Sequence, residues 1–248
     1  MILNEHRWSL EGRGNIMKNI AIIPARSGSK GLKNKNIKLF NGKPLMWYSI
    51  DVALQSGCFD EVMVSTDSEK YADIAKACGA EVPFLRTKDA SADNASSWAV
   101  VREVIEQYKK LGHLYDTVML LQPTSPMRQP NDIIKAYEIM NEKKARSVIS
   151  VCEVEHSPLW CNTLPMDNNL SGFIDLKALS RRQDLPCYYR INGAIYLTKV
   201  DDNIGENLYD SNGFAYIMPK ERSIDIDSDL DFRIAEEIVK YKGSKFEL

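Results

Sequence analysis

From Asn19 onward, short apolar runs alternate with longer segments in which apolar residues recur at helical spacing. Short apolar runs bounded by turn residues are typical of buried strands. We expect strands at residues 20–24, 61–66, 80–85, 117–121, 147–151, 191–198 and 214–218, and helices beginning near residues 43, 68, 94, 130 and 229. This alternation predicts an α/β fold with a Rossmann-like, mostly parallel sheet that has helices on both faces.

Capping residues support several of these helix ends. Pro44 suits the first turn of a helix, and Ser68 is a typical N-cap residue. Gly79 fits the left-handed backbone conformation in which many helices end. Ser228, followed three residues later by Asp231, predicts a capping box at the start of the last helix.

Two stretches fall outside the alternation. Residues 1–17 carry scattered charges and no apolar core, so we expect a disordered extension before a folded domain at residues 18–248. Residues 152–190 contain three prolines and only short apolar pieces, which predicts an inserted, β-rich dimerisation lobe. The lobe has too little regular structure for its own core, and its aromatic residues favour a homodimer contact. These are Trp160, Phe173, Tyr188 and Tyr189.

Composition narrows the class of protein. The 248 residues are 44% hydrophobic and 27% charged, as in soluble globular proteins. No apolar run approaches the roughly 20 residues that span a bilayer, so we expect no membrane association. The five cysteines form no CxxC pair and the three histidines are widely separated, which indicates reduced thiols in a cytoplasmic protein without a zinc site.

The net charge of −2 conceals a strong asymmetry. Residues 18–46 contain seven basic residues and no acidic one, and subtracting these seven charges leaves −9 on the other 219 residues. A basic stretch inside an acidic protein favours a discrete anion site over the broad positive face of a nucleic-acid-binding protein.

The basic stretch contains a glycine-rich loop, PARSGSKGLKNKN (residues 24–36), directly after the first predicted strand. Open α/β sheets bind ligands at this edge. Backbone amides near Gly28 and Gly31 can approach a phosphate, while Arg and Lys side chains neutralise its charge. The loop lacks both the GxGxxG spacing and the ending of a P-loop. A solvated basic turn is the alternative, but the absence of any acid favours phosphate binding.

An acidic segment, SIDIDSDLDF (residues 223–232), lies near the other end of the chain. In an extended backbone Asp225 and Asp227 point to one face, and the isoleucines beside them point to the other. Two carboxylates on one face suit Mg²⁺, which also keeps waters and binds substrate phosphates. Alternatively, the acids favour the N-terminus of the last helix. That reading accounts for Asp229 and Asp231 but not for the two acids upstream of the cap.

Two further segments place polar groups beside predicted strands. LQPTSPMR (residues 121–128) ends a central strand in a proline-bounded turn, where Gln122 offers both a donor and an acceptor; a plain turn is equally consistent. RINGAIY (residues 190–196) predicts a buried strand with an Asn-Gly kink, in which Tyr196 alone is a packing residue.

These motifs, together with STDS after the second strand, stand in the order and at about the spacing of the acylneuraminate cytidylyltransferases, the CMP-sialic acid synthetases. The resemblance covers residues 19 to about 242. It implies a nucleotidyltransferase that uses CTP and Mg²⁺ to convert a nine-carbon (nonulosonic) sugar acid into its CMP derivative, with release of pyrophosphate.

The resemblance also implies roles for individual residues. The family's triphosphate-binding residues fall on Arg26, Lys30, Lys35 and Asn36, and its cytidine-binding residues on Arg86, Ala95 and Ser97. Its sugar-binding residues fall on Gln122, Arg182 and Tyr196, and its metal-binding residues on Asp225 and Asp227.

The reaction that the resemblance implies brings two anions together: the anomeric hydroxyl of the sugar acid would attack the α-phosphorus of CTP. We therefore expect catalysis to depend on charge neutralisation of the departing pyrophosphate and on a metal that lowers the pKa of the attacking hydroxyl. The expected catalytic residues are Arg26, Lys35, Asp225 and Asp227. No side chain stands out as a general base.

Two other functions fit parts of the sequence. Asp225-Ile226-Asp227 is formally a DxD motif of glycosyltransferases, but only 21 residues follow it, where acceptor-binding sequence would be expected. A nucleotide-binding module without catalysis would not need both carboxylates.

One departure from the family concerns the sugar. Trp160 stands where some sialate-specific relatives have a lysine, which removes a cation and adds an apolar face. We expect N-acetylneuraminic acid as the first substrate, on family prevalence, and legionaminic acid as the second.

Overall fold

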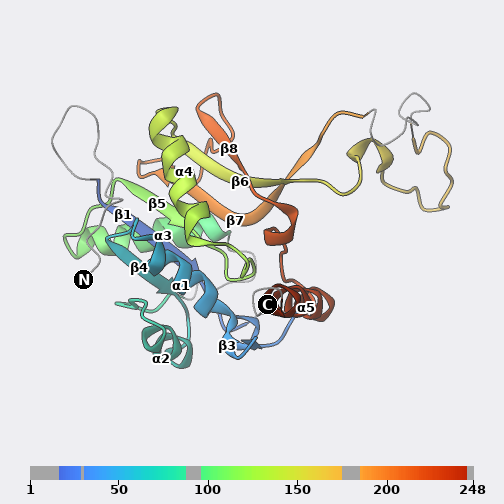
Figure 1. The fold of residues 1–248 in the computed structure, drawn as a ribbon. Helices are drawn as coiled ribbons and strands as arrows, with labels where there is room; N and C mark the ends of the chain where they lie inside the picture. Colours follow the sequence, from blue (N-terminus) through green and yellow to red (C-terminus); the bar gives the residue numbers. More distant parts are fainter. Residues whose placement is uncertain (1–16, 29–30, 88–95, 175–184, 245–248) are drawn as a thin grey trace.

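The computed structural model describes residues 17–28, 31–87, 96–174 and 185–244. Within them, six strands form one sheet in the order β4-β1-β5-β7-β6-β8 (Figure 1). β7 runs antiparallel to both of its neighbours and the other pairings are parallel, so the prediction of a mostly parallel sheet is confirmed. The strands are β1 (Asn19–Pro24), β4 (Glu61–Ser65), β5 (Thr117–Leu120), β6 (Ser147–Glu153), β7 (Tyr189–Lys199) and β8 (Gly213–Ile217).

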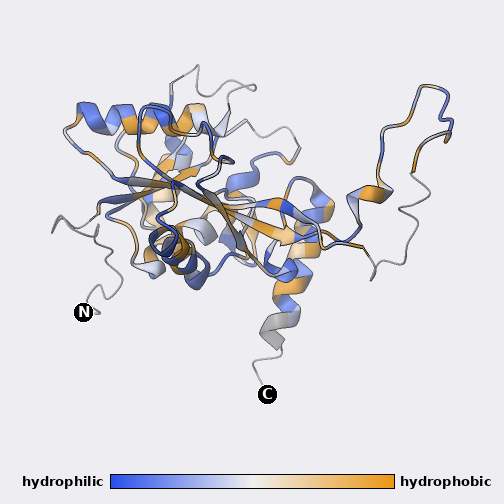
Figure 2. Ribbon diagram, turned by 90° about the horizontal axis from the view of Figure 1, so that it is seen from above, coloured by the Kyte–Doolittle hydropathy of each residue, from blue (hydrophilic) through white to orange (hydrophobic). Residues whose placement is uncertain are grey.

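Helices cover both faces of this sheet (Figure 2). Successive strand residues point to opposite faces. Ala21 and Ile23 of β1 pack in the core cluster that includes residues of α1, α2 and α4, whereas Ile20 and Ile22 pack with α3. The helices are α1 (Leu45–Ser56), α2 (Glu69–Ala77), α3 (Ser97–Lys110), α4 (Pro130–Glu142) and α5 (Asp229–Ser244).

Two sequence-based predictions of local structure are wrong. Lys43-Pro44 is not a first helical turn but the strand β3 (Lys43–Pro44), which pairs with β2 (Leu39–Phe40). Asn41 and Gly42 between them have φ values of 43° and 81°, and two residues at positive φ are typical of a tight hairpin. Residues 80–85 form only an isolated bridge at Glu81, since Pro83 has no N–H for a longer ladder.

A third apolar cluster joins α5 to the β2-β3 hairpin and to the acidic segment. Phe232 of α5 lies 5.5 Å from Phe40 between ring centroids, and the buried Ile226 belongs to the same cluster. The predicted capping box is present, because Asp231 accepts from the Ser228 backbone N–H at 2.7 Å and Ser228 Oγ accepts from the Asp231 N–H at 3.2 Å. The acidic segment is therefore anchored directly before a capped helix.

An arm leaves the sheet between β6 and β7 (Figures 1 and 2); its described residues are 154–174 and 185–188. Val154 N–H donates to the Tyr188 carbonyl at 2.9 Å, which continues the β6-β7 pairing for one step. Beyond that point the described residues contain a 3₁₀ turn at Pro158–Trp160 and no strand, so the expectation of a β-rich lobe is not met in them.

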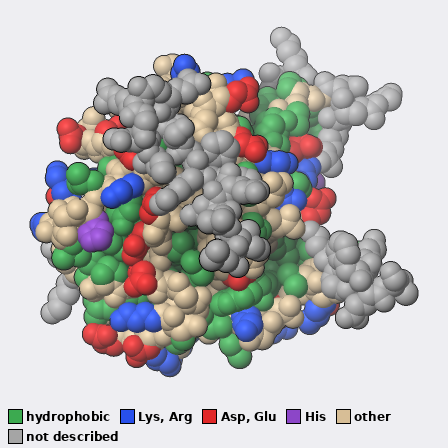
Figure 3. Space-filling model, turned by 60° about the vertical axis from the view of Figure 1, so that its left-hand side comes forward, with side chains coloured by type: hydrophobic (Ala, Val, Ile, Leu, Met, Phe, Trp, Pro, Cys, Tyr) green, Lys and Arg blue, Asp and Glu red, His purple; other side chains and the backbone are tan. Residues whose placement is uncertain are grey.

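Residues 1–16 of the predicted extension lie outside the described part of the chain, but Met17, its last residue, is buried in the fold. None of the helices in the described residues is long and apolar enough to cross a membrane. On the face in Figure 3, basic and acidic side chains are intermingled.

Candidate active site

Three segments distant in sequence meet at the carboxyl ends of β1 and β5. These are the basic loop after β1, the turn after β5 and the acidic segment before α5. Lys35 Nζ donates to the Ile226 carbonyl at 2.9 Å and to Asp227 Oδ1 at 3.0 Å. Ile226 N–H donates in turn to the Thr124 carbonyl at 2.9 Å. The segments that carry the predicted anion site and the predicted cation site are therefore in direct contact.

Glycine at position 31 permits this meeting of chains. A Cβ built on Gly31 would lie 2.6 Å from the Asp227 carbonyl oxygen, which is too close for any other residue without backbone movement. At Gly28, by contrast, an added Cβ would meet no atom of the described residues within 4 Å. The two glycines of the loop thus differ, because Gly28 has room for a side chain, whereas Gly31 permits close packing against the acidic segment.

The shape of the basic loop is fixed by side-chain bonds to its backbone. Buried Asn36 donates to the Arg26 carbonyl at 3.0 Å. Asp67, the acid of the STDS motif, accepts from the Ser27 N–H at 2.8 Å and from Ser27 Oγ at 3.0 Å. The Ser27 amide is therefore already engaged by a carboxylate. Lys30, a predicted phosphate contact, lies outside the described residues.

Arg86 is held at the end of β4. Its Nε donates to Ser65 Oγ at 3.1 Å and its Nη2 to the Ser65 carbonyl at 2.8 Å. Burial lowers the pKa of Arg86, and the charges of Asp67 and Glu103 oppose that effect. Of the other two predicted cytidine contacts, Ser97 is the first residue of α3 and Ala95 lies outside the described residues.

On the other side of the site, polar oxygens converge on Gly193, the predicted kink in β7. Gly193 has φ 76°, and a Cβ built on it would lie 2.7 Å from Gln122 Oε1, 3.5 Å from Asp225 Oδ2 and 3.6 Å from Ser125 Oγ. Asp225 Oδ1 and Ser125 Oγ are buried and have no hydrogen-bond partner within the described structure. Buried polar atoms normally have partners, so these two indicate a place for a ligand.

The two predicted metal carboxylates have different surroundings. Burial raises the pKa of Asp225; a hydrogen bond from Thr124 lowers it and the charge of Asp227 raises it further. The Asp227 side chain is 75% exposed and pairs with Lys35. As the helix-terminus alternative predicts, Asp231 is a capping residue, while Asp229 pairs with Lys38 and Arg233.

The residues present fit Mg²⁺. No group of three or more His, Cys, Asp or Glu side chains in the described ranges forms a metal cluster. Mg²⁺ is commonly bound through one or two carboxylates together with substrate phosphates. The unpartnered Asp225 Oδ1, close to the basic loop, supplies an oxygen of the required kind.

Tyr196 lies beside this group of residues. Its ring is 6.3 Å from that of Trp98 between centroids, in an edge-to-face contact. Burial raises its pKa to about 12, with smaller contributions from Tyr209 and Asp225, so the hydroxyl is neutral at neutral pH. Arg182, the predicted partner of the sugar carboxylate, lies outside the described residues.

Sequence reasoning missed several residues of the site. Arg190 donates to the Ser223 carbonyl at 3.1 Å, and Asn192 donates to Ser223 Oγ at 2.9 Å, so both tie β7 to the acidic segment. Asp67 and Ser125 stand inside quoted motifs without an assigned role. The sequence signal for this part of the site is the Asn192-Gly193 pair. It predicts a kink in the strand, but it does not predict which groups lie opposite the kink.

Comparisons with known proteins decide the family. Residues 20–240 match the family described as Cytidylyltransferase. The chain belongs to the cytidylyltransferase family. It is therefore a nucleotidyltransferase, and neither the glycosyltransferase alternative nor the silent module is supported.

Curated relatives with similar sequence identity to this chain are named after different sugar acids. The chain is 36% identical to the CMP-N,N'-diacetyllegionaminic acid synthase of Legionella pneumophila, over 90% of this chain and 97% of that protein. It is 38% identical to the N-acylneuraminate cytidylyltransferase of Escherichia coli over 91% of this chain, and the match covers about half (53%) of that relative. It is 36% identical to the pseudaminic acid cytidylyltransferase of Campylobacter jejuni, covering 90% of this chain and 97% of that protein.

Solved structures support the fold. A CMP:2-keto-3-deoxy-manno-octonic acid synthetase complexed with CTP superposes with a TM-score of 0.67 at 16% identity, over 91% of this chain and 99% of that one. The 4-diphosphocytidyl-2C-methyl-D-erythritol synthase of Anaerococcus prevotii gives a TM-score of 0.59 at 14% identity, over 90% and 99% of the two chains. The cytidylyltransferase fold is thus common to proteins of low sequence similarity.

Proposed function

We propose that this cytidylyltransferase transfers CMP from CTP to the anomeric hydroxyl of a nonulosonic acid and releases pyrophosphate. The observation that carries the proposal is the direct contact between the basic loop and the acidic segment at Lys35 and Asp227. A triphosphate needs cations, and a phosphoryl-transfer metal needs carboxylates, so both belong at one site. The names of the curated relatives support the same class of acceptor.

Basic residues are proposed to bind the phosphates, and acidic residues to bind the metal ion. Arg26 and Lys35 neutralise the negative charge that grows on the leaving pyrophosphate. Asp225 and Asp227 hold Mg²⁺, which when bound supplies charge neutralisation and lowers the pKa of the attacking hydroxyl. Asn36 fixes the loop through the Arg26 carbonyl, and Arg86 is available to the cytosine base from its anchor on Ser65.

The proposed sugar side is formed mainly by amide and hydroxyl groups, of which Ser125 is buried while Gln122 and Tyr196 are half-buried. Gln122, Tyr196 and the unpartnered Ser125 hydroxyl provide amide and hydroxyl contacts for the acid, with Arg182 as the predicted bidentate partner of its carboxylate. N-acetylneuraminic acid stays the first predicted substrate and legionaminic acid the second, and the Campylobacter relative adds pseudaminic acid to the set that must be tested.

Pyrophosphate release from CTP and Mg²⁺ in the presence of each acid tests the proposal. We expect release with at least one nonulosonic acid and none without an acid, with UTP, or in EDTA. Preference for the eight-carbon acid KDO over all three nonulosonic acids would overturn the assignment of the acceptor.

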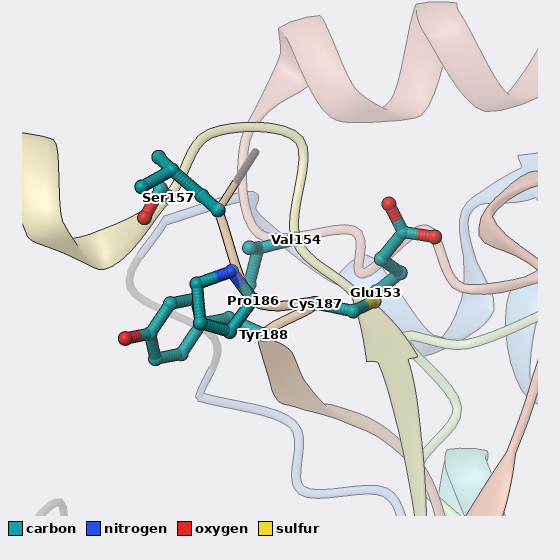
Figure 4. Close-up of a pocket in the computed structure, with 7 residues that line it drawn as sticks. Glu153, Val154, Ser157, Pro186, Cys187 and Tyr188 are labelled. Carbon is teal, nitrogen blue, oxygen red and sulfur yellow. The ribbon is translucent and has the colours of Figure 1, made fainter. Parts of the chain in front are cut away.

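We also propose a homodimer formed through the arm. Leu164, Met166 and Leu170 of the arm are exposed, and a cavity of about 520 Å³ opens where the arm joins the sheet (Figure 4). Exposed apolar groups of this kind favour a partner surface. Light scattering is expected to give twice the chain mass of 28.2 kDa, and a monomer at micromolar concentration would refute the dimer.

We place the reaction in the cytoplasm, because none of the five cysteines, all of which lie in the described residues, forms a disulfide bond, and thiols persist in a reducing compartment. Fractionation of cells that express the chain is expected to recover it with the cytoplasmic proteins, and recovery in an oxidising compartment would contradict the assignment.

A further inference from the structure

Arg128 is a charged residue that has no role in the proposed function. It ends the turn after β5 and is only 2% exposed. In the part of the chain that the structure describes, no carboxylate forms an ion pair with it, in contrast to Arg146 and Arg222. Burying a charge is costly unless hydrogen bonds replace the lost water.

Three hydrogen bonds replace that water. Arg128 Nε donates to the Ala194 carbonyl at 2.8 Å, Nη2 to the Gln122 carbonyl at 3.0 Å, and Nη1 to Ser49 Oγ at 3.2 Å. Burial lowers the pKa of Arg128 to about 9, and the charge of Asp132 opposes this effect. The guanidinium is therefore charged at neutral pH, and its planar fork holds acceptors from three elements in fixed relative positions.

These acceptors adjoin the sugar side of the site. The Gln122 carbonyl also accepts from Ser49 Oγ at 3.2 Å and from the Ser125 N–H at 3.3 Å, so the backbone of the turn is fixed at its first residue. Ala194 follows Gly193, around which Gln122 Oε1, Ser125 Oγ and Asp225 Oδ2 gather. One guanidinium thus connects the backbone beneath Gln122 with the backbone beside Gly193.

We propose that Arg128 is a positioning residue for the acceptor half of the site. It sets the distance between the Gln122 turn and the Gly193 kink, and through them the positions of the Gln122 amide and the Ser125 hydroxyl. The assignment of these groups to the sugar acid rests on the proposed function. The connection itself rests on the three hydrogen bonds and on the burial of Arg128.

The test compares Arg128→Met and Arg128→Lys with Arg146→Met. Arg146 is the control, because it also forms several hydrogen bonds, with Asp201 and Asn203, but it has a carboxylate partner and precedes β6, at the opposite end of the sheet. Methionine keeps much of the length and removes all donors. Lysine keeps the charge but cannot bond three acceptors in the plane of a fork.

Arg128→Met is expected to lower kcat/KM for the nonulosonic acid at least tenfold and to leave KM for CTP within twofold. Arg128→Lys should recover thermal stability but not kcat/KM for the acid. Arg146→Met should lower Tm without changing either kinetic constant. Gly193→Ala should reproduce the acceptor-specific loss with Arg128 intact.

Wild-type kinetics in Arg128→Met, or equal losses for both substrates, would overturn the positioning role. If Arg128→Met does not fold, wild-type kinetics in both Arg128→Lys and Gly193→Ala would overturn it instead. A readout that needs no substrate separates this proposal from the proposed function. Hydrogen exchange at residues 122–128 and 191–196 should rise in the folded Arg128 variants and not in Arg146→Met, even if the wild type releases no pyrophosphate.

Discussion

The phosphate side and the sugar side of the site are built in different ways. On the phosphate side, Lys35 pairs with an Asp227 carboxylate that is 75% exposed, and the loop lies in an acid-free stretch of sequence. On the sugar side, Ser125 and Arg128 are buried, and Gly193 is closely surrounded by polar oxygens. If the proposed function is correct, the side that meets the highly charged nucleotide uses charge, whereas the side that binds the sugar acid uses fixed polar geometry.

This difference predicts how variants will fail. Changes of charge on the phosphate side should lower the rate for every acceptor with little effect on folding. Changes on the sugar side should alter the choice of acceptor and, because the groups are buried, stability as well.

The largest effect is expected at the two carboxylates. Asp225→Asn and Asp227→Asn keep shape but remove charge, so both should be folded and nearly inactive, with a loss beyond about a hundredfold, which is roughly 3 kcal/mol of transition-state stabilisation. Initial rates across a Mg²⁺ titration measure this. Asp229→Asn is the control, since Asp229 pairs with Lys38 and Arg233 and should be within about twofold of wild type. Equal damage in the control, or full wild-type activity in EDTA, would contradict the metal assignment.

The next largest effect is expected in the basic loop. Arg26→Ala and Lys35→Ala should each lower the rate about a hundredfold, because each removes a cation from the leaving pyrophosphate. Tm should fall only modestly, since Asp227 is 75% exposed, and the fall should be larger for Lys35→Ala, because the Lys35 side chain is only 14% exposed and also bonds the Ile226 carbonyl. Pyrophosphate release at several salt concentrations measures the rate, and thermal unfolding measures Tm. Near wild-type rates with an unchanged salt response would mean that the loop does not bind phosphate.

A smaller effect is expected at Trp160. In the structure its backbone N–H donates to the Ser157 carbonyl within the 3₁₀ turn of the arm. Trp160→Lys introduces the lysine that the family resemblance implies for some sialate-specific members, so it should shift kcat/KM toward N-acetylneuraminic acid relative to legionaminic acid by about tenfold, or about 1.4 kcal/mol. The ratio for the two acids, measured in one competition assay, tests this. An unchanged ratio would remove Trp160 from the specificity of the enzyme.

The smallest effect on activity is expected at the cap of α5. Ser228→Ala should cost about 1 kcal/mol of unfolding free energy and leave kcat unchanged, since Ser228 caps the helix and contacts no predicted ligand. The hydrogen bond from Ser228 lowers the pKa of Asp231 below 3.8. A carboxyl pKa that is lower in the folded state stabilises the fold above the unfolded-state pKa, and this stabilisation is lost as the pH falls through the folded-state pKa. The stability difference should therefore be full at pH 7 and shrink below about pH 3.8, and a difference that grows in acid would contradict this.

The difference between the two sides also explains what could be predicted from the sequence. The order of strands and helices follows from local hydrophobic periodicity, and the basic loop and the Asp225-Asp227 pair follow from local charge. Residues 80–85 look like a strand because they are apolar, but Pro83 limits the ladder to a bridge at Glu81.

Arg128 and Gly193 could not be assigned in this way, because their roles arise from contacts with residues far away in the chain. Arg128 bonds Ser49 and Ala194, which lie 79 and 66 residues away. Nothing in the local sequence of LQPTSPMR distinguishes a buried guanidinium from an exposed one. Local charge in the sequence therefore identifies groups that are predicted to act directly on a ligand, whereas groups that are proposed to act through other residues emerge only from the packed structure.

The most direct measurement of the central claim is ³¹P NMR of the reaction of wild-type protein with CTP, Mg²⁺ and each nonulosonic acid in turn. If CMP is transferred at this site, the α-phosphorus of CTP converts to the phosphodiester of a CMP-sugar while equimolar pyrophosphate appears, and Asp225→Asn gives neither signal. Pyrophosphate accompanied by free CMP alone, or no consumption of CTP with any of the acids, would contradict transfer to a nonulosonic acid.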